Sequence, residues 1–346
     1  MDILFFVPAI HQLPTGGNIY NQKIIEHLSK IANIKVVIAE SELLPIQITT
    51  DFSNRNNGVI IIDSLLANDI EGIREIRNEA RFVRLILVVH YLHLLNPKNN
   101  DLFKVSSELE MLRLFNGFIA ISHYSRHVLI SHNVSPEDIA VVHPGVDEVY
   151  HSSVPQRTGL NVIRLLTVSN MLPGKGLIEF VDVLEKIKSL SWTWDLVGSS
   201  KLDSDYSSQF KNRLSNSLVK HRVQIHENLV GINVLHMYNE SDIFIHPAKF
   251  DNAPLVIREA MIRGLPIVAY QVGGIREILD SPSEEWLIPP GDTDGMAKAI
   301  TELINDEQRR DYIGKAGLER SKSFLTWNQV GEKFHSFLKS AYCGMN

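Results

Sequence analysis

The sequence of 346 residues predicts an α/β protein built from two doubly wound parallel domains. Strand and helix patterns alternate along the chain, which is the order that produces parallel sheets covered by helices. The chain is also too long for one ordinary α/β core. Residues 148–161 lack hydrophobic periodicity and are rich in Ser, Pro and Gly, so they are predicted to be the linker between domains at 1–150 and 151–326. Residues 327–346 are predicted to form a last helix.

The composition excludes several classes of protein. Hydrophobic residues make up 44% and charged residues 21%, the ordinary balance of a soluble globular protein, and the net charge of −6 argues against a general nucleic-acid binder. Cys343 alone cannot make a disulfide framework or a cysteine-rich metal site, so a reducing, cytoplasmic location is expected. The apolar N-terminus is interrupted at Pro8 and has no basic region, which favours a first strand over a signal peptide. No apolar run reaches the roughly 18 residues of a transmembrane helix.

Six apolar runs predict the strands of the first domain: Ile3–Val7, Ile34–Ala39, Gly58–Ile62, Leu85–His90, Gly117–Ile121 and Ile139–Val142. The loop after the first run ends in Gly16 and Gly17, where glycine lets the backbone approach a ligand, although the same pair also suits an ordinary tight turn. His90 ends the fourth run, and ligands of such sheets bind beyond the carboxyl ends of the strands. A buried structural histidine is the alternative for His90, and His93 is a weaker candidate.

Five runs predict the strands of the second domain: Val162–Val168, Trp194–Val197, Val223–His226, Ile243–His246 and Pro266–Ala269. The loop after the first contains Asn170 and then Lys175 between two glycines, where an ammonium group suits a phosphate held by a helix N-terminus. Its glycine spacing is not that of a Walker loop. Gly198 directly follows the second strand, where a nucleotide base would stack close to the backbone.

The most informative stretch follows the strand that ends at His246. Its polar loop contains Asp251, Asn252, Ala253 and Pro254, and a helix is predicted to begin at Pro254 or just after it. The first-turn N–H groups at Leu255 and Val256 favour phosphate, whereas the carboxylates of Asp251 and Glu259 accept hydrogen bonds from hydroxyls. The stretch therefore suits a ligand that carries both phosphates and sugar hydroxyls.

Two Asp-x-Asp triplets suggest metal sites at first sight. Residues 203–205 are expected in an exposed serine-rich loop, and residues 292–294 are expected to cap a helix, so no metal site is predicted. The remaining chain predicts helices at Thr293–Asn305, Glu307–Phe324 and Trp327–Tyr342.

The stretch from Asp251 resembles the signature of family 4 glycosyltransferases of the GT-B fold. That signature has two acidic residues separated by seven others, here Asp251 and Glu259, and continues as Ala260-Met261, Gly264 to Ala269 and Gly273 to Glu277. The chain departs from it at Asp251, where the family usually has glutamate, and at residues 252–254, where it usually has Gly-Phe-Gly. The loop before Lys175 is also similar to the family's phosphate loop, but Asn170 replaces its arginine, whose bidentate grip on a diphosphate asparagine lacks.

The resemblance implies two Rossmann-like domains facing a central cleft, with the acceptor bound mainly by residues 1–150 and the nucleotide-sugar donor mainly by residues 151–326. It also implies that the terminal helix at 327–346 crosses back to the first domain. It implies retaining, metal-independent transfer of a sugar from a UDP- or GDP-linked donor to a glycan, lipid or small-molecule acceptor, without a cofactor, and it leaves room for peripheral contact with a membrane. The implied catalytic residues are His90, Lys175 and Asp251. The implied donor-binding residues are Gly16, Gly17, Asn170, Lys175, Gly198, Asn252, Ala253, Pro254, Leu255, Val256 and Glu259. Two alternatives stay open: a related protein that binds a nucleotide sugar or a partner without turnover, and a sugar-nucleotide epimerase of the same fold.

Overall fold

The computed structural model describes residues 1–8, 15–39, 58–66, 68–79, 83–152, 154, 162–227, 229–279 and 286–343. It divides into two compact units. Unit 1 comprises Met1–Gly145 with Leu325–Asn346, and unit 2 comprises Val146–Phe324.

Unit 1 is built on a parallel sheet of six strands in the order β2-β1-β3-β4-β5-β6. Phe5 of β1, the second strand of this order, lies opposite Val36 of β2 and Ile61 of β3. The chain runs from β1 to β2 on one side and then returns to β3 on the other, so the switch point of this sheet lies between β1 and β3. All six predicted strands are present: β1 Asp2–Pro8, β2 Asn33–Ala39, β3 Gly58–Asp63, β4 Arg84–Val89, β5 Gly117–Ala120 and β6 Ile139–Val141.

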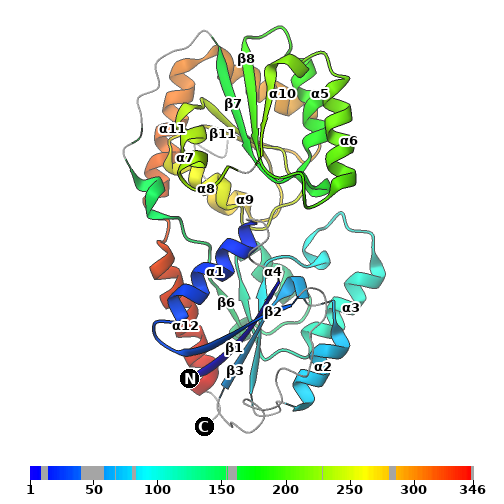
Figure 1. Cartoon of the computed structure of the whole chain (residues 1–346), viewed down its shortest axis with the longest axis vertical. Coiled ribbons are helices and arrows are strands. Elements are labelled where there is room, and N and C mark those ends of the chain that lie inside the picture. The colour runs from blue at the N-terminus through cyan, green and yellow to red at the C-terminus, as the bar shows by residue number, and fades with distance from the viewer. Residues whose placement is uncertain are drawn as a thin grey trace. The chain divides into compact units, whose positions relative to one another are not determined.

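Helices cover both faces of this sheet (Figure 1). On one side α1 (Gly16–Leu28) packs with α12 (Trp327–Cys343), and on the other α2 (Ile70–Glu79) packs with α3 (Leu102–Leu112), while α4 (His123–Ser131) packs with β5 and β6. Val330, Phe334 and Leu338 of α12 are fully buried, and the ring of Phe334 stacks on Phe5 with centroids 6.4 Å apart. The apolar stripe of the last helix is therefore part of the core of unit 1.

Unit 2 contains a second parallel sheet of six strands in the order β12-β11-β10-β7-β8-β9. Its switch point lies between β10 and β7, because the chain adds β8 and β9 on one side of β7 and then crosses to β10 on the other. The strands are β7 Ile163–Val168, β8 Trp192–Val197, β9 Val223–His226, β10 Ile243–His246, β11 Ile267–Tyr270 and β12 Leu287–Ile288. Only β12 was not predicted, because two residues show no hydrophobic period.

The helices of unit 2 also form two layers (Figure 1). One layer contains α5 (Leu177–Lys186), α6 (Ser204–Ser215) and α10 (Thr293–Asn305), and the other contains α7 (Ile232–Glu240), α8 (Leu255–Ile262), α9 (Ile275–Ile278) and α11 (Glu307–Ser321). Trp194 anchors the core under the first layer, with its ring edge-on to Phe180 and Phe210 and its indole N–H donating to Thr167 Oγ1 at 3.1 Å.

The first part of the predicted linker packs on unit 2. Residues Glu148–His151 form a 3-10 turn, and the fully buried Arg263, beyond the end of α8, donates to the carbonyl groups of Tyr150 and Ser152 at 2.8 and 2.7 Å. A guanidinium with several donors can satisfy carbonyl groups that the turn leaves without partners, so these residues are held in place. Residues 153 and 155–161 of that linker lie outside the described residues.

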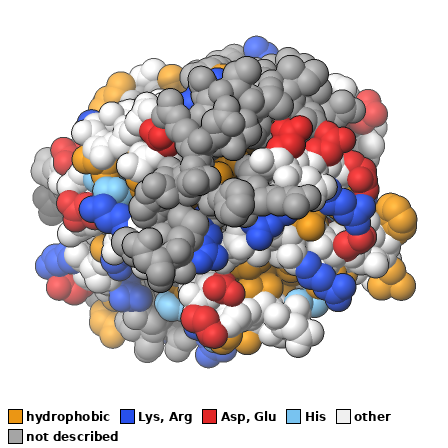
Figure 2. Space-filling model, turned by 90° about the horizontal axis from the view of Figure 1, so that it is seen from below, with side chains coloured by type: hydrophobic (Ala, Val, Ile, Leu, Met, Phe, Trp, Pro, Cys, Tyr) orange, Lys and Arg blue, Asp and Glu red, His pale blue; other side chains and the backbone are white. Residues whose placement is uncertain are grey.

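Charges of both signs are interspersed among the described side chains on the face of the molecule shown in Figure 2. Within the described ranges, no helix combines the length and the apolar character that crossing a bilayer requires.

Candidate functional site

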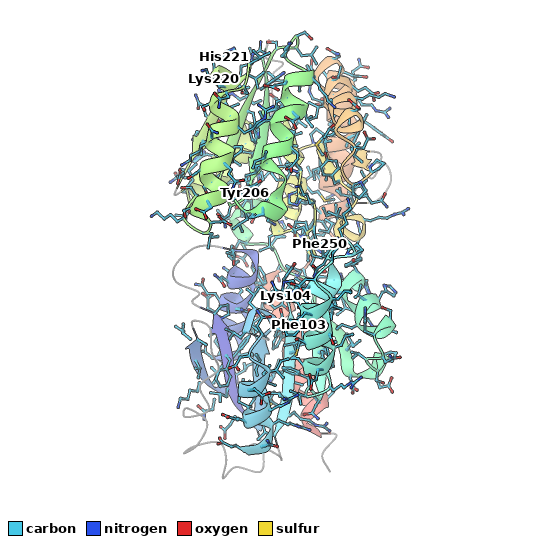
Figure 3. The ribbon with its side chains drawn as sticks, turned by 90° about the vertical axis from the view of Figure 1, so that its right-hand side faces the viewer. Phe103, Lys104, Tyr206, Lys220, His221 and Phe250 are labelled. Carbon is cyan, nitrogen blue, oxygen red and sulfur yellow. The ribbon has the colours of Figure 1, made fainter. Side chains whose placement is uncertain are left out.

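Three loops of unit 2 meet at the carboxyl edge of its sheet, at the switch point between β7 and β10. The N–H of Lys249, in the loop after β10, donates to Gly174 O, in the loop after β7, at 2.9 Å. The N–H of Gly274, after β11, donates to Asp251 O at 3.2 Å. Figure 3 labels Phe250 in the loop after β10, at the opposite end of unit 2 from Lys220 and His221, which precede β9. This edge is where doubly wound sheets bind ligands.

Gly176 makes the contact between the first two loops sterically feasible. Its φ of 67° lies in the left-handed region, and a Cβ atom at this position would lie 2.1 Å from Pro247 O. Any other residue would separate the loops after β7 and β10. The position of Lys175, the preceding residue, therefore depends on this glycine.

Lys175 and Asp251 form an ion pair across these loops. Lys175 Nζ lies 2.7 Å from Asp251 Oδ2, and their side chains are 29% and 16% exposed. His246, buried at the end of β10, places its Nε2 3.3 Å from the same oxygen. Burial alone would raise the pKa of Asp251, but the ammonium of Lys175 and the imidazole of His246 outweigh it and hold that pKa well below its ordinary value. The pair therefore keeps a carboxylate and an ammonium fixed at the switch point.

Sequence reasoning selected Lys175 and Asp251 separately and missed both their contact and His246. The only signal for His246 was its place as the last residue of a strand that borders the switch point. A histidine in a buried strand is more often structural, so this signal was weak.

Helix α8 begins beside this pair. It starts at Leu255 with Pro254 as its N-cap, as predicted, and no side chain caps it. The first-turn N–H groups, including those of Leu255 and Val256, have no acceptor within the helix. Asn252 is buried in the preceding loop and Ala253 is partly buried. The N-terminus of α8 thus adds a partial positive charge to the edge that carries Lys175.

Glu259 lies in the second turn of α8, where two tyrosines surround it. Tyr238 donates its hydroxyl to Glu259 Oε2 at 2.8 Å, and the Tyr150 hydroxyl also bonds to this carboxyl group. Burial, assisted by the negative charge of Asp147, raises the pKa of Glu259 to about 7, although the two hydroxyl groups oppose the shift. Neither tyrosine was predicted, since both lie far from Glu259 in the sequence.

Asn170 and Gly198 connect the ends of β7 and β8. Asn170 Oδ1 accepts the N–H of Ser199 at 3.0 Å, and Met171 N donates to Ser199 O at 2.9 Å. A Cβ on Gly198 would lie 1.9 Å from Ser169 O, so only glycine permits this approach. Both residues therefore have a structural reason for their identity, and their predicted contact with a nucleotide remains a prediction.

The carboxyl edge of unit 1 carries a second group of polar side chains. His90, directly after β4, is buried, and its Nε2 lies 2.9 Å from Asn21 Oδ1 of α1 and 3.6 Å from Asp63 Oδ2 at the end of β3. Gly17, in the first turn of α1, faces the His90 ring: a Cβ there would lie 3.4 Å from the ring Cγ. Gly16 begins α1 behind a Thr15 cap. The structure thus brings together Gly17 and His90, which the sequence indicated separately, and adds Asn21 and Asp63, which it did not indicate.

His93 has a structural role. Glu108 of α3 accepts both the N–H of His93 at 2.6 Å and its ring Nδ1 at 2.8 Å, and it also accepts the N–H of Leu94. This carboxylate therefore fixes the turn after β4.

The two Asp-x-Asp triplets are explained by helix capping. Asp203 was expected in an exposed loop, but it is the N-cap of α6 and accepts the N–H of Tyr206, so that expectation was wrong. A Ser-Asp run after aspartate is itself a helix start, which explains the error. Asp292 caps α10 as predicted. In the part of the chain that the structure describes, no three His, Cys, Asp or Glu side chains are grouped in a way that would hold a metal ion.

Residues 155–320 match the family model described as Glycosyl transferases group 1. Sulfoquinovosyl transferase SQD2 of Arabidopsis thaliana is 32% identical over 116 residues, which cover 33% of this chain and 22% of that protein. The amylovoran biosynthesis glycosyltransferase AmsK of Erwinia amylovora is 24% identical over 250 residues, 68% of this chain and 57% of that protein. The chain thus spans between 22% and 57% of the length of these two relatives.

Solved structures share the fold over nearly the whole chain. The structure of Anabaena Alr3699/HepE in complex with UDP-glucose has a TM-score of 0.80 at 17% identity, covering 98% of this chain and all of that one. Sucrose-phosphate synthase from Thermosynechococcus elongatus has a TM-score of 0.82 at 16% identity, covering 99% of this chain and all of that one. The predicted GT-B fold of two Rossmann-like domains is confirmed.

Proposed function

We propose that this protein transfers a sugar from a nucleoside-diphosphate-sugar donor to an acceptor with retention of anomeric configuration. The match of residues 155–320 to the model of glycosyl transferases group 1 supports this proposal. The observation that carries the proposal is the Lys175–Asp251 pair at the switch point of unit 2, beside the N-terminus of α8. This edge combines a cation, a helix N-terminus and a carboxylate, and a nucleotide sugar has a group that each of these can bind, since phosphates suit the first two and sugar hydroxyls can donate to the third.

Each part of the donor has a matching group in this proposal. The diphosphate lies between the Lys175 ammonium and the N–H groups of Leu255 and Val256. Asp251 accepts a hydrogen bond from a hydroxyl of the sugar, and Glu259 accepts from the ribose. When the bond between the anomeric carbon and the diphosphate breaks, the leaving oxygen keeps the electron pair, and these positive groups stabilise the charge that develops there.

The donor nucleotide is uridine or guanosine diphosphate in this proposal. The HepE complex with UDP-glucose shares the fold, so UDP-sugars are the first donors to test. The acceptor is a glycan, a lipid or a small molecule with a nucleophilic hydroxyl, and a lipid acceptor would bring peripheral contact with a membrane. Gly16, Gly17 and His90 of unit 1 are proposed to face the transferred sugar or the acceptor.

Glu259→Ala is expected to weaken nucleotide binding by about 1.5–3 kcal/mol, the range for a hydrogen bond to a charged group. The loss arises because ribose hydroxyls would no longer find the carboxylate that Tyr238 and Tyr150 now orient. Calorimetric titration with UDP and GDP measures the effect. Glu185→Ala, which removes a carboxylate bound to Arg213 elsewhere in unit 2, is the matched control and should bind normally. Equal affinities for wild type and Glu259→Ala would exclude the ribose contact.

Nucleotide affinity is also expected to depend on pH. The pKa of Glu259 is raised to about 7, so the carboxyl group is protonated below that pH and ionised above it. Ribose hydroxyls donate better to the ionised form, so binding should strengthen as the pH rises from about 6 to about 8, by at most about tenfold per pH unit. The Glu259→Gln variant should show no such rise. A slope that persists in this variant would assign the titration to another group.

A screen of donors and acceptors tests the proposed function. Wild-type protein is incubated with UDP-, GDP- and ADP-sugars, with and without candidate acceptors, and released nucleoside diphosphate is measured. Release that depends on an acceptor supports a transferase, and product analysis by NMR then reports the anomeric configuration. Binding of a nucleotide sugar without any release favours the binding protein, and conversion of the donor sugar into its epimer favours the epimerase.

A further inference from the structure

Three buried polar side chains from separate elements converge at the carboxyl edge of unit 1. Asn21 of α1 and Asp63 at the end of β3 are fully buried, and the side chain of His90 is 6% exposed. The hydroxyl of Ser64 accepts the N–H groups of both His90 and Tyr91 at 3.0 and 3.1 Å, which fixes the backbone at this turn. Buried polar groups persist only when they are paired, so the direction of each hydrogen bond in this cluster is informative.

The chemistry of the groups determines those directions. A carboxylate only accepts, and Asp63 accepts the N–H of Leu65 at Oδ1 (2.8 Å) and the side-chain amide of Asn21 at Oδ2. Asn21 therefore turns its NH₂ toward Asp63 and its Oδ1 toward His90. Because Oδ1 is an acceptor, the His90 Nε2 that lies 2.9 Å from it must carry a hydrogen. The direct Nε2 to Asp63 distance of 3.6 Å is too long for a hydrogen bond, so Asn21 connects the two.

The His90 ring is also neutral and held in place. Burial lowers the pKa of His90, and the charge of Asp63 only partly opposes this shift. The neutral ring carries one hydrogen, and if Nε2 holds it, Nδ1 is an acceptor. The Tyr20 ring lies edge-on to His90 with centroids 5.1 Å apart, and Gly17 also packs against the His90 ring.

We propose that Asp63 and Asn21 are positioning residues that fix His90 as its Nε2–H tautomer. A partner of Nδ1, whether it belongs to the chain or to the substrate, must then donate a hydrogen, as a sugar hydroxyl does. In this tautomer His90 is a neutral, oriented group, and it supplies neither a positive charge for the diphosphate nor a proton for the leaving group. The consequence for turnover rests on the proposed function, whereas the tautomer does not.

Asp63→Asn gives a sharp test because it inverts the polarity of the cluster with almost no change in shape. The amide introduced by this substitution must use its oxygen to accept the Leu65 N–H, so its NH₂ faces Asn21. Asn21 then rotates its own amide, turns its NH₂ toward His90, and forces Nε2 to become the acceptor. The hydrogen of His90 moves to Nδ1.

The tautomer is read from ¹H–¹⁵N NMR spectra of histidine-labelled protein, in which His90→Gln identifies the His90 signals among the 14 histidines. The expected result is a protonated Nε2 in wild type and a protonated Nδ1 in Asp63→Asn. Transfer should fall by about tenfold or more in the variant, since small errors in placing a catalytic group are costly, and nucleotide affinity should not change. Asp195→Asn is the matched control: its carboxylate holds His226 Nε2 at 2.6 Å in unit 2, so His90 and turnover should be unaffected.

Several outcomes would overturn the proposal. Protonation of Nδ1 in wild type would do so alone, even if Asp63→Asn does not fold. An unchanged tautomer in a folded Asp63→Asn protein would refute the relay through Asn21, and an inverted tautomer with normal turnover would refute its role in transfer. If wild type transfers no sugar but shows the predicted tautomers, the proposed function fails while the relay stands.

Discussion

Replacing Lys175 by alanine is expected to lower kcat/KM for sugar transfer by about 10³-fold. The ammonium is removed from the proposed diphosphate site, and Asp251, which now lies 2.7 Å from it, would face the diphosphate without a counter-ion. Two unit charges about 4 Å apart interact by about 4 kcal/mol near a protein surface, which corresponds to roughly 10³-fold. The variant thus loses the attraction between Lys175 and the diphosphate, and it gains a repulsion between Asp251 and the diphosphate.

Two further variants show whether the loss of activity comes from the missing charge of Lys175. Lys186→Ala removes an ammonium that pairs with Asp294 elsewhere in unit 2, and it should transfer normally. The double variant Lys175→Ala/Asp251→Asn should bind nucleotide better than Lys175→Ala, because it removes the repulsion, and the two changes would then be non-additive. Near-normal turnover by Lys175→Ala would assign the diphosphate to another cation, such as Lys249, whose ammonium lies 2.5 Å from Glu179.

Asp251→Asn is expected to reduce turnover by about 10²-fold while leaving nucleotide affinity unchanged or increased. The substitution keeps the shape but removes the charge that accepts a sugar hydroxyl, and a hydrogen bond to a charged group contributes about 1.5–3 kcal/mol. It also releases Lys175 from its carboxylate partner, so the ammonium interacts more strongly with the diphosphate. A fall in kcat without weaker binding separates this role from a general loss of the site.

The control for this variant is Asp182→Asn, whose carboxylate pairs with Arg213 at the surface of unit 2. Asp251→Glu introduces the glutamate that family 4 glycosyltransferases usually have at this position, and this variant should retain much of the activity. Normal turnover by Asp251→Asn with every donor would show that the charge has no part in transfer.

The structure changes one expectation about Asn170. The resemblance to family 4 glycosyltransferases alone leads to the expectation that Asn170→Arg keeps or increases transfer, because that family usually has an arginine at this position. Asn170 Oδ1, however, accepts the N–H of Ser199, and an arginine has no acceptor to replace it. The added cation therefore comes with an unsatisfied backbone donor, which costs about 1–3 kcal/mol when it is buried.

The sequence predicted the elements of the fold better than the contacts of the site. Strands such as Ile243–His246 are continuous apolar runs between loops, and this pattern is local. The pairing of Lys175 with Asp251 depends on two strands that become neighbours only through the crossover that makes the switch point. The burial of Asn21 and Asp63 beside His90 also depends on tertiary structure, and single polar residues in the sequence give no sign of it.

Gly176 and Gly198 also show that local sequence does not predict tertiary contacts. The sequence indicates that Gly176 belongs to a loop suited to phosphate, but its left-handed conformation and its contact with Pro247 come from the loop after β10. The sequence likewise singles out Gly198, but it does not show that a Cβ at this position would lie 1.9 Å from the backbone oxygen of Ser169. In both cases the sequence identified a glycine in a loop of interest, but it did not show which segment of the chain lies against that glycine.

The most direct test of the central claim is calorimetric titration of UDP, GDP and ADP into wild type, Lys175→Ala, Glu259→Ala and the control Lys186→Ala. The claim is that the carboxyl edge of the second sheet, at its switch point, binds the nucleotide of the donor. The predicted result is binding of at least one nucleoside diphosphate to wild type and to Lys186→Ala, with an affinity at least about tenfold lower in Lys175→Ala and in Glu259→Ala. The same affinity in all four proteins, or no binding of any nucleotide to wild type, would contradict the account.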